Sequence, residues 1–272
     1  MSDSLSGTAM SFVGDDDGQL LFISRSNGIT TAFTWDAAGR LTGIKDGDHA
    51  DQRFSLTADG NVSQYDYTLP LEPPEAPADA EETITFDKAS QISLSGYSYD
   101  QLGCRTASPV GSFTWDAAGR LTATDNATFE YNGLGDLTSR ESGAAAVDYF
   151  HNYAIANRPL AAEKDTATGQ PIRYYVWSPD GHLLYMIDAR AANAVSYYHF
   201  DRTGSTLFLT NASGAVTDAY SYSPYGRMLS RSGSSTQPFT FAGHYGTRQE
   251  GAGRLYHMRA LLRCAHRPLH LP

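Results

Sequence analysis

The chain of 272 residues carries a formal net charge of −10, and only 18% of its residues are charged. This acidic balance argues against a general affinity for nucleic acid. No apolar run reaches the roughly 18 residues that a membrane-spanning helix needs. The 17 Tyr, 12 Phe and 25 Gly favour strands separated by tight turns over helices. The composition therefore predicts an all-β protein.

The first residues, MSDSLSGTAMSFVGDDDG, are acidic and lack the basic and apolar regions of a signal peptide. We therefore expect no export signal within this chain, which leaves its location open. The carboxylates of residues 15–18, DDDG, suit either a calcium site or a polar turn before Leu20. We favour the turn because it matches the repeat that continues along the chain.

The peptide FTWDAAGRLT occurs at residues 33–42 and again, unchanged, at residues 113–122. Its first three residues alternate aromatic and polar side chains, which is typical of a strand. Asp36 and Asp116 can accept hydrogen bonds from backbone N–H groups further along the turn, and Gly39 and Gly119 tolerate a positive φ. Each copy therefore predicts a β-hairpin with an Asp-x-x-Gly turn.

Weaker copies share the same order of an aromatic residue, an Asp-like residue and a Gly three residues later. Their predicted turn residues are Asp100, Gly103, Asn132, Gly135, Gly181, Asp201, Gly204 and Gly226. Residues 86–92 keep the spacing but lose the Gly, and residues 56–62 lose the Asp. Many hairpins laid side by side can bury one shared aromatic face. We therefore expect consecutive antiparallel hairpins in a curled, shell-like sheet, a partial barrel or spiral.

Two stretches interrupt this pattern. Residues 68–82, TLPLEPPEAPADAEE, are rich in Pro and acidic residues and predict a disordered insertion. Residues 231–237, RSGSSTQ, predict a flexible connection before the last block.

The repeat Y-D-x-x-G-R-L resembles the YD repeat of bacterial Rhs proteins, of insecticidal toxin-complex shells and of teneurins. Residues 197–260 are similar to the Rhs repeat-associated core, with YYHFDRTGS, YSYSPYG and PFTFAGHYG in the family's order. The resemblance assigns residues 1–196 to YD-type hairpin repeats and 197–260 to this core. It implies a spiral β-shell around a C-terminal toxin cargo, which many members release by aspartyl self-cleavage. It also implies secretion or cell-surface delivery of the parent protein.

The tail departs from that family pattern. After Ala260 the family continues with an R-Y-Y-D motif, whereas residues 261–272 read LLRCAHRPLHLP. One set of codons for residues 260–272 encodes RYYDARTGRFIS when a CG pair is restored after the first codon. We therefore hypothesise that residues 261–272 are frameshifted and that the cargo is missing; sequencing the gene across this junction tests it.

No local signature of an enzyme or metal site is found, so we expect no catalysis and no cofactor. His199 and Asp201 fit the start of a repeat turn better than a catalytic pair, and His244, Glu250 and His257 match no metal-ligand spacing. Cys104 and Cys264 suit two idle thiols rather than a disulfide. The alternative function is carbohydrate binding, with Trp35, Trp115 and Trp177 stacking on sugars. Open sheet edges also predict self-association.

Overall fold

A computed structural model of the chain describes residues 1–74, 83–249, 254–257 and 260–263. In these residues the regular structure is β-sheet, apart from one short 3-10 turn, η1 (Gly243–Tyr245). The strand pairs of these residues are antiparallel, and within each sheet every strand pairs with its neighbours in the sequence. The predicted all-β fold of consecutive hairpins in a curled, shell-like sheet is confirmed.

The strands form three sheets. The first sheet contains β1 (Met10–Gly14), β2 (Leu20–Arg25), β3 (Thr30–Trp35), β4 (Leu41–Asp46), β5 (Ala50–Leu56) and β6 (Val62–Thr68). The second contains β7 (Ser98–Tyr99), β8 (Arg105–Ser108), β9 (Gly111–Trp115), β10 (Leu121–Thr124), β11 (Ala127–Tyr131), β12 (Leu137–Ser142), β13 (Ala145–His151), β14 (Leu160–Asp165), β15 (Pro171–Trp177), β16 (Leu183–Asp188), β17 (Ala194–Phe200), β18 (Thr206–Thr210), β19 (Val216–Tyr222) and β20 (Met228–Ser232). The third contains β21 (Arg248–Gln249), β22 (Arg254–His257) and β23 (Ala260–Arg263).

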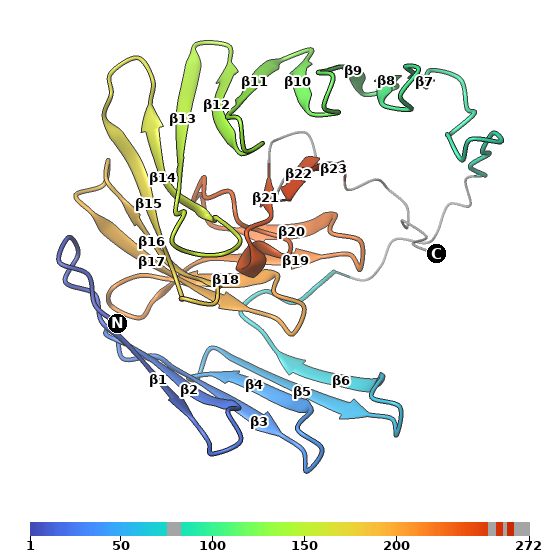
Figure 1. Ribbon diagram of the computed structural model, residues 1–272. Helices are drawn as coiled ribbons and strands as arrows, with labels where there is room; N and C mark the ends of the chain where they lie inside the picture. Colours follow the sequence, from blue (N-terminus) through green and yellow to red (C-terminus); the bar gives the residue numbers. More distant parts are fainter. Residues whose placement is uncertain (75–82, 250–253, 258–259, 264–272) are drawn as a thin grey trace.

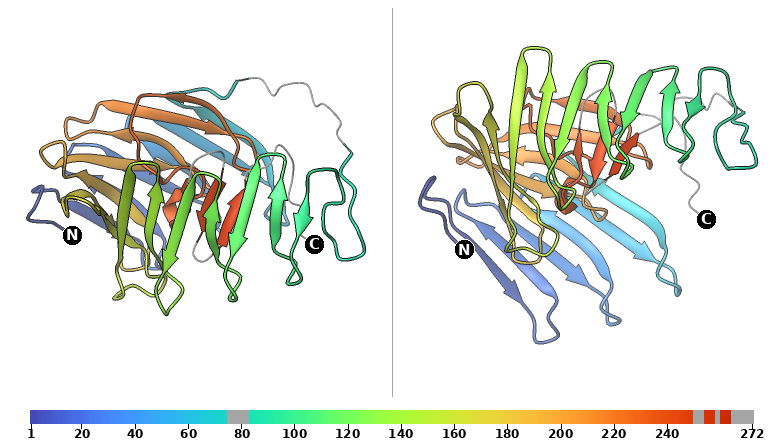
Figure 2. Two further views of the ribbon diagram at one scale, coloured as in Figure 1. Left: turned by 90° about the horizontal axis from the view of Figure 1, so that it is seen from above. Right: turned by 45° about the horizontal axis from the view of Figure 1, so that its top comes forward.

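The fourteen-stranded sheet bends back on itself. Its early strands, β7 to β12, lie across from β18 to β20, and β21 to β23 lie between the two arms (Figure 1). The six-stranded sheet packs on the opposite side of β16 to β19, so these strands form the middle layer (Figures 1 and 2). The architecture is therefore a curved wall with a small sheet inside the curve and a second sheet outside it.

The middle layer is buried on both faces because successive side chains of a strand point to opposite sides and each side is covered by another part of the chain. On β17, Tyr197 packs with Met10 of the first sheet, whereas Tyr198 packs with Phe239 on the inner side. On β18, Phe208 and Leu209 divide between the two sides in the same way. These strands therefore consist of nearly continuous apolar and aromatic residues, unlike the alternating strands of the simple repeats.

The predicted insertion at residues 68–82 begins at the end of β6. Leu69 and Leu71 lie partly buried against the cluster that contains Ala50, Phe208 and Ala219. Residues 75–82 lie outside the described part of the chain. The start of the insertion is therefore anchored on the core of the second sheet.

Candidate functional site

The Asp-x-x-Gly turn has the same geometry in both copies of the duplicated peptide. The Asp36 N–H donates to Arg40 O at 2.9 Å, and the Gly39 N–H donates to Asp36 O at 2.9 Å. Asp36 Oδ1 also accepts hydrogen bonds from the backbone N–H groups of Ala38 and Arg40, each at 2.9 Å. Arg40 Nε donates to Asp36 Oδ2 at 2.7 Å. One carboxylate thus satisfies two turn amides and one guanidinium.

The second copy repeats these contacts at Asp116, where Arg120 Nε lies 2.7 Å from Asp116 Oδ2. Gly39 and Gly119 have φ values of 74° and 72°, which a residue with a Cβ adopts only with strain. The pKa of Asp36 is held below its ordinary value, first by the hydrogen bond from the backbone N–H of Arg40 and also by the Arg40 guanidinium and the Ala38 N–H. Arg120 and Ala118 lower the pKa of Asp116 in the same way.

The other turn residues named from the sequence occupy the same positions. In each of these turns the backbone N–H of the Gly donates to the C=O of the first turn residue. The turns span Asp100–Gly103, Asn132–Gly135, Ser178–Gly181, Asp201–Gly204 and Ser223–Gly226. At Asp201 the side chain accepts hydrogen bonds from the N–H groups of Thr203 and Ser205 at 2.8 and 2.9 Å. Burial raises the pKa of this carboxyl, in contrast to Asp36. The turn at Asn211–Gly214 has the same bonds but was missed, because Thr210 replaces the preceding aromatic residue.

Each Trp indole N–H is bound to the backbone of the neighbouring strand. Trp35 donates to Leu20 O at 2.9 Å, Trp115 to Arg105 O at 2.8 Å and Trp177 to Leu160 O at 2.7 Å. Trp177 is only 5% exposed and its ring meets Phe239 edge-on at 5.4 Å, so it has no free face for a sugar ring. For Trp35 and Trp115, sugar stacking remains a prediction.

The inner face of strands β9 to β12 is apolar and rich in aromatic residues, and their outer face is polar. Phe113 and Phe129 are buried, whereas Thr114 and Thr128, which alternate with them, are exposed. Tyr149 packs against the same cluster, and the Arg248 guanidinium of β21 lies 4.3 Å from its ring centroid. Because β21 lies inside the curve, this contact identifies the aromatic face as the inner wall (Figure 1).

The chain after β20, which is the last part of the core region of residues 197–260, covers the inner side of the middle layer. Phe239 is fully buried, and its ring meets Tyr175 edge-on at 4.8 Å. The Thr206 N–H donates to Thr240 O at 2.9 Å, and the Thr206 hydroxyl donates to Phe239 O at 2.8 Å. The His244 N–H binds Gly204 O at 3.0 Å, which fixes η1 over the Asp201–Gly204 turn.

A buried polar network joins the first sheet to the outer side of the middle layer. His199 Nδ1 lies 2.8 Å from Asp46 Oδ1, which also accepts a hydrogen bond from the Thr31 hydroxyl. Arg25 Nη1 donates to that hydroxyl at 2.7 Å, and Arg25 Nη2 donates to Tyr198 O at 3.4 Å. A guanidinium from β2, a carboxylate from β4 and an imidazole from the distant β17 thus meet between two sheets.

The same network sets the ionisation of its members. Burial lowers the pKa of His199 to about 4, assisted by the positive charge of Arg25 and only partly opposed by Asp46. Burial by itself would raise the pKa of Asp46, but His199, Arg25 and Thr31 together hold it below the ordinary value. Near neutral pH the network therefore contains one cation, one anion and a neutral imidazole.

The structure separates the remaining residues that the sequence singled out. His199 belongs to the buried network and Asp201 to a turn. Among the described residues, no three His, Cys, Asp or Glu side chains gather as ligands for a metal ion. Glu250 and Cys264 lie outside these residues, as do residues 264–272 of the suspected frameshift. Asp46, the acidic partner of His199, carried no sequence signal because 153 residues separate the two.

No helix in the described ranges is long and apolar enough to cross a membrane.

Solved structures with a similar fold include those described as "TcdB2-TccC3-Cdc42", with a TM-score of 0.64 and 13% identity, and "TcdB2-TccC3", with a TM-score of 0.63 and 12% identity. A third is the Tc holotoxin pore of Photorhabdus luminescens, with a TM-score of 0.55 and 13% identity. Each match covers 94% of this chain, whereas this chain covers only 17% or 18% of the matched chain. A comparison with curated proteins finds no match.

The family described as Teneurin YD-shell matches residues 8–250. This range includes every Asp-x-x-Gly turn, both arms of the curved sheet and the segment around η1. The chain therefore belongs to the Teneurin YD-shell family, and it is a structural shell protein of the Rhs/YD-repeat type.

Proposed function

We propose that this chain is a segment of a wall that would enclose a C-terminal polypeptide cargo in the intact parent protein, in the way the toxin-complex relatives suggest, and that the wall acts without catalysis. The observation that carries the proposal is the two-sided character of β9 to β12. Their apolar, largely aromatic face lines the inside of the curve, and their polar face is turned to solvent. An apolar inner wall suits a partly unfolded chain, whose exposed apolar side chains gain from leaving water.

The docking of β21 on the inner wall supports this proposal. Arg248 is buried and its guanidinium lies over the Tyr149 ring, so the inner face accepts polypeptide that follows the core segment. The chain direction after η1 thus leads along the inside of the curve (Figure 1). Cargo attached beyond β23 would begin its path at this wall. The proposal includes that the parent protein is delivered outside the producing cell.

The test is protease protection of an attached reporter. A short unfolded reporter peptide is joined after Pro272 in one protein and before Met1 in a second, and both are digested with trypsin. Enclosure predicts that the C-terminal reporter is cleaved more slowly than the N-terminal one, because cleavage tracks access. Equal cleavage of both reporters would contradict the proposal. Size and circular dichroism of both fusions must match those of the parent chain.

A further inference from the structure

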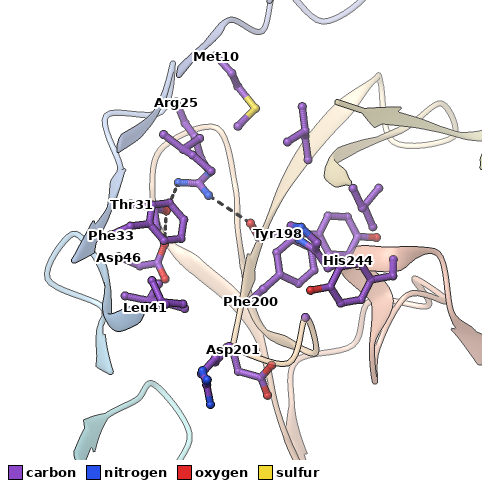
Figure 3. A pocket seen from close by; sticks show the side chains of 17 residues that line it. Met10, Arg25, Thr31, Phe33, Leu41, Asp46, Tyr198, Phe200, Asp201 and His244 are labelled. Atoms are coloured by element: carbon purple, nitrogen blue, oxygen red, sulfur yellow. Dashed lines mark hydrogen bonds between the residues drawn. The ribbon is translucent and has the colours of Figure 1, made fainter. Parts of the chain in front are cut away.

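Strand β6 lies at the margin of the first sheet, and all seven of its residues are exposed (Figures 1 and 2). Other strands of this sheet bind the middle layer. Figure 3 shows Arg25 of β2 bonded to Tyr198 O of β17, and Gln52 of β5 donates to Phe200 O at 3.2 Å. Within the described residues β6 pairs only with β5, so one row of its backbone N–H and C=O groups has no strand beside it. Such a row can pair with a strand of another chain.

The other ends of the first two sheets are shorter or covered. At β1 the Met10 N–H donates to Met1 O and the Met1 amino group donates to Met10 O, each at 2.8 Å. β7 has two residues and β20 has five. β6 contains no Lys or Pro, which commonly keep edge strands from pairing. Its register with β5 shifts only near Val62, so residues 64–68 form a regular open edge.

One face of β6 carries an ordered row of aromatic rings. Tyr65 stacks on Phe54 of β5 with centroids 5.2 Å apart, and the Tyr67 ring lies 4.9 Å from the Tyr65 ring. The Tyr65 hydroxyl donates to Gln52 Oε1 at 3.0 Å. Tyr65 and Tyr67 are nevertheless 38% and 44% exposed. Because these rings are already held in place, a strand that packs beside them orders few further side chains.

The sequence of β6, VSQYDYT, is complementary to a second copy of itself in the antiparallel direction. Tyr65 is the central residue, so full overlap places it opposite Tyr65 of the other copy and places Gln64 opposite Asp66 in two symmetric pairs. Gln64 Nε2 already lies 3.0 Å from both Asp66 carboxylate oxygens within one chain, so this amide is a suitable donor for the facing carboxylate.

The charge of Asp66 selects this register over its neighbours. Sliding the two copies by two residues in one direction would place Asp66 opposite Asp66, and like charges directly opposite each other are unfavourable. Sliding them in the other direction would place Asp66 opposite Val62, which offers no hydrogen-bond donor in its side chain. Only the central register gives each Asp66 a donor and each Tyr65 an aromatic partner.

We propose that the open edge of β6 pairs with β6 of a second copy of this chain, which joins the two first sheets into one continuous sheet. The contact is isologous, so it closes at two copies. Phe54 and Tyr65 of both copies then form one aromatic stripe across the joint, and such cross-strand pairs stabilise a sheet. The pairing uses the outer sheet and is independent of cargo enclosure.

Sedimentation velocity of the full chain at physiological ionic strength measures the association, and we expect an equilibrium between monomer and dimer. Gln64→Asp sets a carboxylate opposite Asp66 in both symmetric pairs, so it should weaken the dimer by about tenfold. Adding Asp66→Lys to Gln64→Asp makes both pairs opposite in charge and should restore the affinity of the parent. Gln101→Asp is the matched control, because it adds the same charge at an exposed turn residue and should dimerise like the parent.

Cysteine cross-linking tests the register in a chain that carries Cys104→Ser and Cys264→Ser. Tyr65→Cys places one thiol on each copy at facing positions, where Cα atoms lie about 4.5–5.5 Å apart, within the range of a disulfide. Oxidised glutathione should therefore produce a covalent dimer on a non-reducing gel. Asp66→Cys in the same chain faces Gln64 of the other copy and should produce little.

Four outcomes would overturn the proposal. They are a parent chain that stays monomeric, an open series of larger oligomers, equal affinity of Gln64→Asp and the parent, and cross-linking of Asp66→Cys as strong as that of Tyr65→Cys. Circular dichroism of each variant must match that of the parent, so that a weaker dimer reports on the strand edge rather than on unfolding.

Discussion

His199 Nδ1 donates a hydrogen bond of 2.8 Å to Asp46 Oδ1 across the interface between the first sheet and the middle layer. His199 and Asp46 are each only 1% exposed. Because Asp46 also accepts from Thr31, which binds Arg25, the contact joins the N-terminal repeats to the strand that opens the core segment. This interface holds the curved wall against its outer sheet, and it can be tested directly.

Asp46→Ala should lower the free energy of unfolding by about 3–5 kcal/mol, because it leaves the Arg25 charge buried without a partner. Urea unfolding followed by Trp fluorescence measures the loss. Asp51→Ala is the matched control: Asp51 pairs with Arg53 at 2.6 Å, but the Arg53 side chain is 74% exposed. That change should cost far less than Asp46→Ala, because an ion pair with an exposed partner contributes little to stability. Similar losses in the two variants would contradict the role of the network.

Stability should fall as the pH drops from about 6.5 to about 4. The pKa of His199 is lowered from 6.5 to about 4 in the folded chain, so in this window the unfolded chain binds a proton that the folded chain does not. The loss in the free energy of unfolding that this protonation causes is absent above pH 6.5. It grows as the pH falls and reaches about 3 kcal/mol near pH 4.

The check is urea unfolding of the parent and of His199→Gln at several pH values between 4 and 7. The Gln side chain does not titrate but retains an N–H group for Asp46. Its stability should therefore depend less steeply on pH than that of the parent. Other titrating groups, including His244 with a pKa lowered to about 3 by burial, are present in both proteins. Equal slopes would rule out His199 as the cause.

Two glycine substitutions test whether the packing of η1 makes its turn less tolerant of a side chain than a simple repeat turn. They are Gly119→Ala in a simple turn and Gly204→Ala in the turn beneath η1. Both residues have a positive φ, 72° and 81°, so the strain of adding a Cβ is about 1 kcal/mol in each. A Cβ at Gly119 has only Cys104 Sγ nearby at 4.0 Å, whereas at Gly204 it would collide with the Tyr245 ring and lie 3.1 Å from His244 Cβ. Gly204→Ala should therefore cost about 1–3 kcal/mol more. Equal changes in thermal stability would show that η1 adapts freely.

Trp177→Phe should destabilise the chain more than Trp35→Phe. Both substitutions remove an indole N–H that binds a backbone carbonyl, at 2.7 Å for Trp177 and 2.9 Å for Trp35. At Trp177 the freed Leu160 carbonyl and the lost ring volume lie in the buried cluster with Phe239, so the cost is about 2–4 kcal/mol. At the half-buried Trp35 it is about 1 kcal/mol. Urea unfolding measures both, and a larger loss at Trp35 would contradict this assignment.

The repeat unit could be predicted from the sequence because its determinants are local. Asp36, Gly39 and Arg40 contact one another within five residues, so the turn, its direction and the strand alternation follow from a short peptide. The same local order predicted antiparallel pairing between consecutive strands. It missed Asn211–Gly214, where the turn bonds form without the aromatic residue that the pattern required.

Long-range placement was not encoded in any local pattern. The sequence by itself determined a chain of β-hairpins with an aromatic face and placed it among YD-repeat proteins. Only the tertiary structure decided that the first sheet packs outside the middle layer, that β21 to β23 lie inside the curve, and that Arg25, Asp46 and His199 meet in one buried network. The physical reason is that a turn is fixed by contacts between neighbours, whereas the pairing of two faces depends on which apolar and polar side chains of distant strands can be buried together.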